Sequence, residues 1–451
     1  MKKEENPFIV FLDIDLKKAL IITYYWPPSG GSGVQRWLKF VKYLPENGWL
    51  PIVVVPKNPE YPVFDDSLLK DIPNNVKVLK FPIWEPYSIF KKLTGRKRAD
   101  RVNTGLLFDE IKKSITEKIS LWIRGNLLLP DPRVFWIRPT VRQLKKYLIE
   151  NSIDVIITTG PPHSVHLIGL KLKTQSHIPW VCDFRDHWAN MDMLEKFYIS
   201  TWAAKKQNKL QQKVLDNADL VLTVSNTWAE ELQALTKTPV KSITNGYDED
   251  DFKKNNSIPV PGKFVICHGG IINSYRYPDS LWSAFEELSL EDAEFDKALE
   301  IQIFGITDDG FLNTLRKYPN VFKNVKINGY IQHLELIKQY SKSDCLLLLL
   351  NDTKNSEGHI PGKLFEYLAA NRPIIAFGPV HSDVGKIIKD LNAGFLLEYS
   401  EGQKIKEIIT SIYLNSKNVI SELNKDLISS MSRRSLTAKL VSYLEKLNHI
   451  S

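Results

Sequence analysis

The chain has 451 residues and a formal net charge of +8, with 43% hydrophobic and 25% charged residues. This length exceeds one typical domain and predicts two domains of roughly 200 residues each. The composition is that of an ordinary soluble globular protein, and the positive charge favours an anionic partner such as a nucleotide, an anionic lipid or a nucleic acid. The sequence has no zinc-finger spacing, RNP-type motif or basic tail, so nucleic acid is the weakest of these partners.

The cysteines and the apolar runs argue against disulfides and against membrane-spanning segments. Cys182, Cys267 and Cys345 each lie in or beside an apolar, strand-like run, so we expect buried, reduced thiols rather than disulfides or metal ligands. The N-terminus does not resemble a secretory signal. The longest purely apolar runs are strand-sized and too short to cross a bilayer. We therefore expect a cytoplasmic protein that meets a membrane, if at all, from one side.

Strands alternate with helices from the start of the chain. Residues 19–25 predict a buried strand, and residues 51–55 predict the next one. Between them a helix presents apolar residues every three to four positions and is expected to end at Gly48. Such a unit places its two strands parallel. Further strands are predicted at 154–158, 180–182 and 220–224.

The pattern restarts after a polar, Pro-rich linker at 255–262. A helix is predicted at 281–288, and strands are predicted at 264–267, 301–304, 325–327, 345–350, 373–377 and 395–397. The expected fold class is α/β, with two doubly wound, Rossmann-like domains facing a central cleft. The domains are placed at 17–255 and 262–428. A C-terminal helix over 429–451 is expected to pack back on one of them, by preference the N-terminal one.

The most informative segment runs from 360 to 378. A turn at Pro361 and Gly362 is predicted to open a helix at Lys363, and apolar residues four apart give this helix one buried face. Free backbone N–H groups and an ammonium group at a helix start form a natural anion site. Glu366, one turn later, is an acceptor-only side chain suited to two sugar hydroxyls. The segment fits a phosphate followed by a ribose, and an ordinary amphipathic helix fits it equally well.

A glycine loop lies between the first predicted strand and its helix. The amides of Gly30, Gly31 and Gly33 could hold a phosphate there or let a ligand approach the backbone. The loop is neither a G-x-G-x-x-G fingerprint nor a P-loop, which weakens nicotinamide and ATP interpretations. A flexible glycine turn is an equally good interpretation of the loop.

Single polar residues follow other predicted strands. Arg276 comes after the pair Gly269 and Gly270, where a guanidinium group could grip a diphosphate with two hydrogen bonds. A solvent-exposed arginine is the alternative. His163 lies in a Pro-rich loop at the end of a strand and is a candidate polar contact to a substrate. His166, inside the following helix, is expected to be structural.

Charged residues are also concentrated after the strand that ends near Cys182. Asp186 could orient a substrate hydroxyl, while Arg185 could equally pair with either neighbouring aspartate in a structural bridge. We expect a structural role for Asp183 and leave both roles open for Asp186. No Ser-His-Asp order, zinc spacing or close acid pair indicates hydrolysis.

Taken in order, these segments resemble a GT-B glycosyltransferase of the large retaining family often called family 4. The resemblance covers nearly the whole chain. The matching pieces are residues 21–31 with 34–36, the loops 159–164 and 183–186, Val224-Ser225, Asn245-Gly246-Tyr247-Asp248, Gly269-Gly270 with Arg276, and residues 361–369.

The resemblance implies that the C-terminal half binds a nucleotide sugar and the N-terminal half binds the acceptor. Glu366 would hold the ribose, Arg276 and Lys363 would neutralise the departing diphosphate, and His163 would contact the transferred sugar. Retention would follow from same-face attack, in which the leaving phosphate takes the acceptor proton. The donor-binding residues carried over are Gly270, Arg276, Gly362, Lys363, Glu366 and Glu357.

Two departures from the family pattern stand out. The family usually has a second glutamate eight residues before the ribose-binding one, and this chain has Gly358 there, with Glu357 one residue off. The family also tends to carry a lysine a few residues after the arginine of the Gly-Gly segment. Here 277–279 is Tyr-Pro-Asp, and Lys363 is a candidate substitute.

The stretch from 89 to 136 combines a basic run at 91–101 with an amphipathic pattern that includes Ile115, Ile119 and Trp122. Basic and aromatic residues on one helix suit a lipid interface and an acceptor on a lipid carrier. A helix packed on its own domain explains the pattern equally well.

We interpret the chain as a retaining glycosyltransferase that moves a sugar from a UDP- or GDP-sugar to a glycan or lipid-linked acceptor. Surface polysaccharide or glycoconjugate biosynthesis is the setting that the family implies. No cofactor or metal is expected, and contact with the inner face of an anionic membrane is left open. The alternatives are a GT-B sugar-nucleotide epimerase and a non-catalytic GT-B protein that binds sugar nucleotides, the latter because of Gly358.

Overall fold

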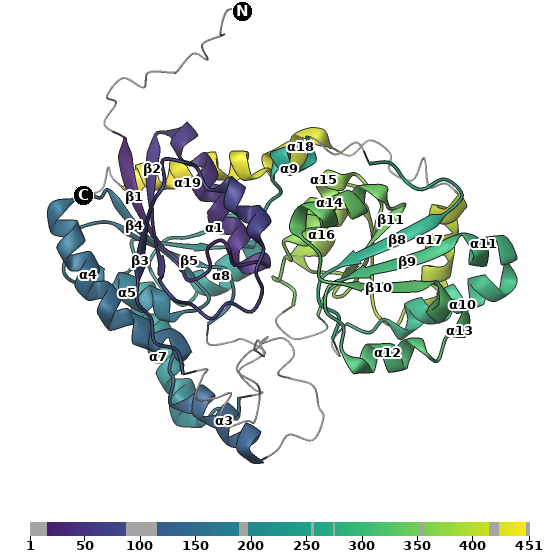
Figure 1. The fold of residues 1–451 in the computed structure, drawn as a ribbon, viewed down its shortest axis with the longest axis horizontal. Helices are drawn as coiled ribbons and strands as arrows, with labels where there is room; N and C mark the ends of the chain where they lie inside the picture. The colour runs from purple at the N-terminus through teal and green to yellow at the C-terminus, as the bar shows by residue number, and fades with distance from the viewer. Residues whose placement is uncertain are drawn as a thin grey trace, which may run out of the picture.

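The computed structural model describes residues 16–86, 115–188, 197–253, 257–273, 276–351, 356–414 and 424–447. Two parallel sheets with helices on their faces lie side by side (Figure 1). The basic run 91–101 lies outside the described residues, as do parts of the predicted linker and of the amphipathic pattern.

The first sheet has seven strands in the order β3-β2-β1-β4-β5-β6-β7. They are β1 (Lys17–Ile22), β2 (Trp49–Pro56), β3 (Lys77–Phe81), β4 (Val155–Gly160), β5 (Trp180–Phe184), β6 (Leu220–Thr223) and β7 (Val240–Ser242). The helices are α1 (Ser32–Tyr43), α3 (Ile115–Asn126), α4 (Ile137–Glu150), α5 (Ser164–Lys173), α7 (Thr201–Asn217), α8 (Asn226–Gln233) and α9 (Glu249–Phe252), with 3₁₀ turns η1 (Pro45–Asn47), η2 (Asp66–Asp71) and η4 (Pro132–Trp136).

Alternate residues of β1 explain why this sheet is covered on both faces. Leu20 and Ile22 pack in one buried cluster with residues of α4 and α5, while Ala19 and Ile21 pack in another with residues of α1. A parallel strand buried on both sides needs apolar residues at every position, because successive side chains point to opposite faces.

The sequence analysis did not predict two edge strands, and it placed the end of one helix wrongly. β3 is an edge strand with exposed lysines, and β7 has only three residues, so neither has the apolar run that marks a buried strand. The first helix ends at Tyr43 rather than at Gly48, because Pro45 cannot continue the hydrogen-bond ladder of the helix. Gly48 ends η1 instead.

The second sheet has six strands in the order β10-β9-β8-β11-β12-β13. They are β8 (Phe264–Gly269), β9 (Leu299–Phe304), β10 (Val325–Gly329), β11 (Cys345–Leu349), β12 (Ile374–Phe377) and β13 (Gly394–Leu397). The helices are α10 (Asp279–Glu291), α11 (Ala293–Ala298), α12 (Asp309–Leu315), α13 (Pro319–Asn324), α14 (His333–Lys342), α15 (Lys363–Ala370), α16 (Asp383–Asp390) and α17 (Gly402–Leu414).

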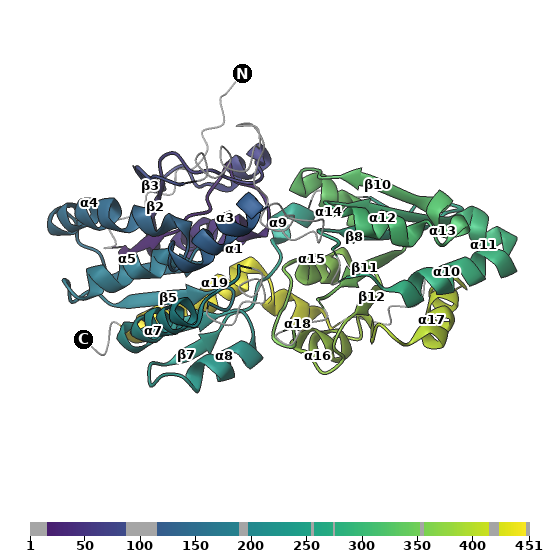
Figure 2. The ribbon, with the colours of Figure 1, turned by 90° about the horizontal axis from the view of Figure 1, so that it is seen from below.

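The C-terminal segment returns to the first domain. After α17 the chain continues through α18 (Lys425–Ser430) to α19 (Arg433–Leu447), drawn in yellow, which lies with the helices of the first sheet in both views (Figures 1 and 2). Leu436, Leu440 and Leu444 of α19 are buried in the same cluster as Trp37 of α1. No helix in the described part of the chain is both long and apolar enough to span a membrane.

Candidate functional site

Each sheet has a point where its strand order reverses, and the site is built from the loops at these points. In the first sheet the order reverses between β1 and β4, and in the second between β8 and β11. Ligands of open α/β sheets bind beyond the carboxyl ends of the strands at such a point. The loops after β8 and β11 carry the predicted donor residues, and the loops after β1 and β4 carry the predicted acceptor residues.

The Gly-Gly pair after β8 lies against Lys363. The Lys363 Nζ atom donates to the Gly269 carbonyl oxygen at 2.9 Å. A Cβ atom on Gly270 would lie 2.8 Å from Nζ, and the φ of Gly270 is +134°, a backbone conformation open to glycine. A side chain at 270 would therefore displace the lysine. The glycine pair and the lysine form one unit, although 94 positions separate Gly269 from Lys363.

The environment of Lys363 disfavours its positive charge. Burial lowers the pKa of Lys363 well below its usual range, and Arg276 lowers it further, while Glu366 acts in the opposite direction. Among the described residues, the hydrogen bonds of Lys363 and Arg276 go to carbonyl oxygens of the backbone and to the Asn351 side chain. An anion placed between the two side chains would stabilise their positive charges. The amides of Leu364 and Phe365 bond to the Pro361 and Gly362 carbonyls. The helix start thus offers fewer free N–H groups than the sequence suggests.

Arg276 is oriented by the loops at the reversal point. Its Nε donates to Asn351 Oδ1 at 2.7 Å, and its Nη1 donates to the Ile271 carbonyl at 2.8 Å. Burial lowers the pKa of Arg276. Since Asn351 follows β11 and Arg276 follows β8, the guanidinium group spans the two strands where the order reverses. It is a partly buried, oriented cation rather than a freely exposed one.

Glu366 faces a histidine that the sequence analysis missed. Nε2 of His333, the first residue of α14, lies 2.8 Å from Glu366 Oε1. The two side chains are 14% and 18% exposed. Burial opposes the charge on His333, but Glu366 and Asp251 outweigh it and raise the pKa of His333. No motif marked this residue, because α14 lies 30 positions before α15 in the chain.

The departure at Gly358 has a steric cause. A Cβ atom at this position would lie 2.3 Å from Cδ1 of Trp228, a buried residue of α8 in the first domain. The indole ring of Trp228 thus fills the space that a glutamate side chain at 358 would enter. Glu357 is exposed and raises the pKa of Glu231 on the opposite domain, where burial is the larger cause. Glu357 is therefore beside the domain junction.

The glycine loop after β1 reaches the second domain. Gly31 has a φ of +84° and precedes α1, while a Cβ on Gly30 would lie 2.9 Å from the Tyr330 hydroxyl. The Gly33 carbonyl accepts a hydrogen bond from Arg185. The loop is therefore fixed by specific contacts rather than flexible. Arg185 donates its other hydrogen bonds to the Gly160 and Pro161 carbonyls.

His163 follows β4, and Asp186 follows the neighbouring strand β5. The His163 ring stacks on Trp188 at 4.9 Å between centroids, and its Nε2 lies 3.2 Å from the His187 carbonyl. Burial lowers the pKa of His163, as does the nearby His166, so the ring is neutral. Burial raises the pKa of Asp186, against the effects of Arg185 and His187.

Asp183 has a structural environment. Its carboxylate binds the Arg36 guanidinium with two hydrogen bonds, at 3.1 and 2.9 Å, and accepts others from Trp37 and Thr159. Asp183 and Arg36 are both buried. The pair ties α1 to β5 directly below the glycine loop.

Three further carboxylates approach one another closely enough to suggest a metal site, but a lysine occupies their centre. Asp71, Asp248 and Asp251 each bind Lys39 Nζ, at 2.8, 2.6 and 3.1 Å. Burial opposes the charge on Lys39, yet the three aspartates outweigh it and raise its pKa. The ammonium group already occupies the space between these carboxylates, so the cluster does not fit a metal ion.

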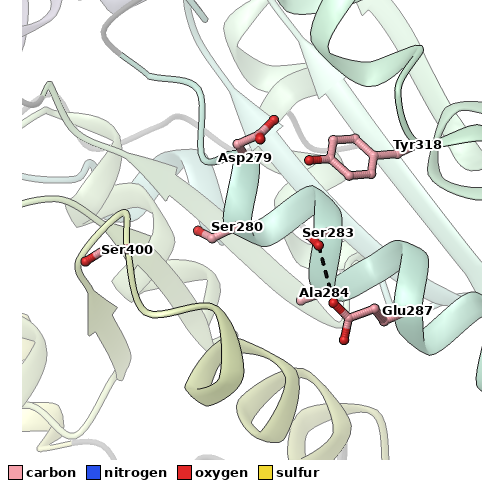
Figure 3. Close-up of a pocket in the computed structure, with 7 residues that line it drawn as sticks. All are labelled: Asp279, Ser280, Ser283, Ala284, Glu287, Tyr318 and Ser400. Atoms are coloured by element: carbon pink, nitrogen blue, oxygen red, sulfur yellow. Dashed lines mark hydrogen bonds between the residues drawn. The ribbon is translucent and has the colours of Figure 1, made fainter.

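A pocket of about 370 Å³ lies on α10, away from the residues described above. Figure 3 shows Asp279 and Tyr318 facing each other across it, with Ser283 and Glu287 hydrogen-bonded at 3.3 Å. The charged side chains that line it, Asp279 and Glu287, are acidic and would repel a nucleotide phosphate. The predicted donor residues do not line this pocket.

Known proteins resemble this chain in part of its sequence and in its fold. Residues 108–251 match the model of Glycosyltransferase Family 4. No curated protein matches the chain.

Solved structures of glycosyltransferases share the fold over nearly the whole chain. Sucrose-phosphate synthase from Thermosynechococcus elongatus is 13% identical with a TM-score of 0.63, over 96% of this chain and 100% of that one. The E. coli trehalose-6-phosphate structure bound with UDP-2-fluoro glucose is 10% identical with a TM-score of 0.58, over 95% and 99%. WaaG, a glycosyltransferase involved in lipopolysaccharide biosynthesis, is 11% identical with a TM-score of 0.55, over 94% and 99%. Identities this low establish the shared two-domain GT-B fold alone.

Proposed function

We propose that this chain, which has the GT-B fold and matches the Glycosyltransferase Family 4 model over residues 108–251, is a retaining transferase that moves a sugar from a nucleotide-sugar donor to a glycan or lipid-linked acceptor. The observation that carries this proposal is the convergence of Lys363 and Arg276 at the strand reversal of the second sheet. Two cations brought together there, with Glu366 on the same helix as Lys363, suit a diphosphate followed by a ribose.

The proposed chemistry rests on charge stabilisation and positioning. When the glycosidic bond to the donor phosphate breaks, negative charge develops on the leaving diphosphate, and Arg276 and Lys363 would stabilise it. Preorganised charges in a site with little water are worth more than in solution. The leaving phosphate oxygen would take the proton of the acceptor hydroxyl. His163, neutral and fixed by Trp188, would contact the transferred sugar, and Asp186 would orient the acceptor.

The donor class is a UDP- or GDP-sugar. The bound UDP-2-fluoro glucose in the E. coli structure supports UDP-sugars as the first to test. We propose that Arg276 and Lys363 neutralise the charge of the diphosphate without a metal ion. Activity in the presence of EDTA, equal to that without it, is the expected result.

Acceptor delivery from a lipid surface is supported by exposed apolar side chains in the first domain. Ile115, Ile119 and Trp122 of α3 are 76%, 53% and 45% exposed, and Trp202 at the start of α7 is 57% exposed. The two helices meet where Asn126 hydrogen-bonds to the Tyr198 carbonyl and the Ser200 amide. Exposed lysines at 118, 205, 206 and 209 accompany them. Apolar and basic side chains together suit an anionic bilayer surface, and WaaG supports a glycolipid acceptor.

Membrane contact is tested by sedimentation with vesicles of phosphatidylglycerol and phosphatidylcholine. The wild type is expected to sediment with the anionic vesicles and to lose this on Trp122→Glu. Ile149→Glu is the matched control, since Ile149 is 85% exposed on α4. Equal sedimentation of both variants would contradict the membrane part of the proposal.

Turnover is tested by following UDP-glucose, UDP-N-acetylglucosamine and GDP-mannose by NMR with the purified protein. We expect slow release of nucleoside diphosphate, with water as a poor acceptor, and a first-formed sugar of the same anomeric configuration as the donor. Arg276→Ala should lower this rate by a factor of about 10²–10³. Inversion of the anomer would contradict retention, and an altered sugar ring stereocentre would indicate an epimerase.

Trp228 favours one alternative function, a protein that binds sugar nucleotides without turnover. Its indole ring occupies the space of the family's first glutamate beside Gly358. Binding of a donor with no diphosphate release, in the presence of membrane lipids as acceptors, would support that alternative.

A further inference from the structure

Glu366 is engaged before any donor arrives. A carboxylate only accepts hydrogen bonds, so the proton between His333 Nε2 and Glu366 Oε1, 2.8 Å apart, belongs to the histidine. The imidazole thus holds one carboxylate oxygen and leaves the other, together with the remaining lone pairs, for a ligand. The bond from His333 uses one of the roughly four acceptor positions of a carboxylate. The remaining positions can accept hydrogen bonds from both ribose hydroxyls.

His333 is itself held by the first domain. Its backbone amide donates to Asp65 Oδ2 at 3.2 Å, and the Tyr330 hydroxyl donates to the same oxygen at 3.4 Å. Asp65 also accepts from the amide of Ser67 at 3.0 Å at the start of η2. Since Gly30 lies against Tyr330, the contact joins the glycine-loop region of one domain to the start of α14 in the other.

We propose that His333 is a positioning residue for donor binding: it fixes the Glu366 carboxylate in the orientation that receives the ribose hydroxyls, and its amide contact with Asp65 links that orientation to the contact between the two domains. This inference rests on the proposed function and adds to it a residue that none of the recognised motifs contains.

The charges around His333 agree with a donor role for its imidazole. Glu366 of α15 faces Nε2, and Asp251 of α9 approaches Nδ1 with its Oδ2 at 4.0 Å. Asp65 of η2 lies at the backbone amide, and Lys39 of α1 is the positive group that opposes them. Two carboxylates against one lysine favour a protonated ring, and a ring that carries its Nε2 proton can hold Glu366.

Without this partner the orientation of the Glu366 carboxylate would be free. Ordering a side chain on binding costs conformational entropy, so loss of His333 should weaken ribose recognition rather than the chemistry of transfer. The expected signature is a higher donor KM with a nearly unchanged kcat.

The test compares a nucleoside diphosphate with its 2′,3′-dideoxy counterpart, using calorimetry on the full chain. UDP and GDP are tried first, and the one that the wild type binds is used with its dideoxy analogue. The variants are His333→Leu, which removes the donor, and His333→Gln, whose amide N–H₂ can replace it. His177→Ala is the control, because His177 is exposed before β5. Thermal unfolding of each variant checks that it is folded.

We expect His333→Leu to lose affinity for the intact nucleotide by about tenfold, the size of one hydrogen bond to a charged group. Its affinity for the dideoxy compound should equal that of the wild type, and His333→Gln should recover most of the loss. Equal losses for both compounds, or no loss for either, would overturn the role of His333. If the wild type binds neither UDP nor GDP, the proposed function itself fails.

Discussion

Lys363 lies in surroundings that favour the neutral form of its amine. Burial and the neighbouring Arg276 both lower its pKa, whereas Lys39 has three carboxylate partners that raise its pKa against the effect of burial. The charge of Lys39 is thus stabilised by groups within the protein. The charge of Lys363 would be stabilised by an anionic ligand. A perturbed pKa without a compensating ion pair is a mark of a functional site, since structural ion pairs satisfy their own charges.

The lowered pKa of Lys363 predicts proton uptake when a diphosphate binds. A nearby anion favours the charged form of an amine and raises its pKa, so binding of the ligand should be accompanied by the uptake of up to about one proton. Calorimetry of UDP binding in buffers of different ionisation enthalpy measures this number. It should fall towards zero in Lys363→Met and persist in Lys389→Met, a change at an exposed lysine of α16. Equal uptake in all three proteins would contradict the assignment.

Helix α1 is the element that connects the glycine loop to the rest of the first domain. Arg36 on this helix binds Asp183 of β5 and also the carbonyls of Ile243 and Thr244. Lys39, one turn later, binds Asp248 and Asp251, which lie where the chain leaves the first sheet. The helix therefore positions the loop before it and the connection to the second domain at the same time.

Removal of Asp183 should destabilise the first domain strongly. Asp183→Ala leaves a buried guanidinium group without its carboxylate, which typically costs about 3–5 kcal/mol. Urea unfolding followed by tryptophan fluorescence measures the loss. The exposed Asp216→Ala on α7 should change stability by less than about 0.5 kcal/mol. A similar small effect for Asp183→Ala would refute the anchoring role of the pair.

On the scale of the whole molecule, two of the contacts between the domains involve residues that the site description has named. Asp65 contacts Tyr330 and the amide of His333 at one of them. At the other, Asp383 Oδ2 accepts from the amide of Thr227 at 3.1 Å, beside the packing of Trp228 on Gly358. The contacts come from the carboxyl-end loops of both sheets, so the predicted donor and acceptor residues lie at one junction.

Restoration of the family's glutamate should open this junction. Gly358→Glu would place its side chain on the Trp228 ring, so we expect a larger radius of gyration in small-angle X-ray scattering. The double change Gly358→Glu with Trp228→Gly removes the clash and should return the radius to that of the wild type. If the single variant keeps the wild-type radius, the Trp228 contact does not hold the domains together.

The sequence was sufficient for the fold and for the segments of the site, but not for their partners. Periodicity located the buried strands and the start of α15 at Lys363, because burial on both faces leaves a clear apolar run. The edge strands β3 and β7 lacked that run. His333, Asp65 and Trp228 were missed, since each acts through a residue far away in the sequence and no local pattern encodes such a pairing.

The central claim, a nucleotide-sugar site built around Glu366, is tested most directly by calorimetric titration of UDP- and GDP-sugars into the wild type, Glu366→Ala and Glu335→Ala. Glu335 is an exposed glutamate on α14 that pairs with Lys338 and serves as the control. We predict that the wild type and Glu335→Ala bind one of the donors equally, while Glu366→Ala binds it at least about tenfold more weakly. Undiminished binding by Glu366→Ala, or no binding of any donor by the wild type, would contradict the account.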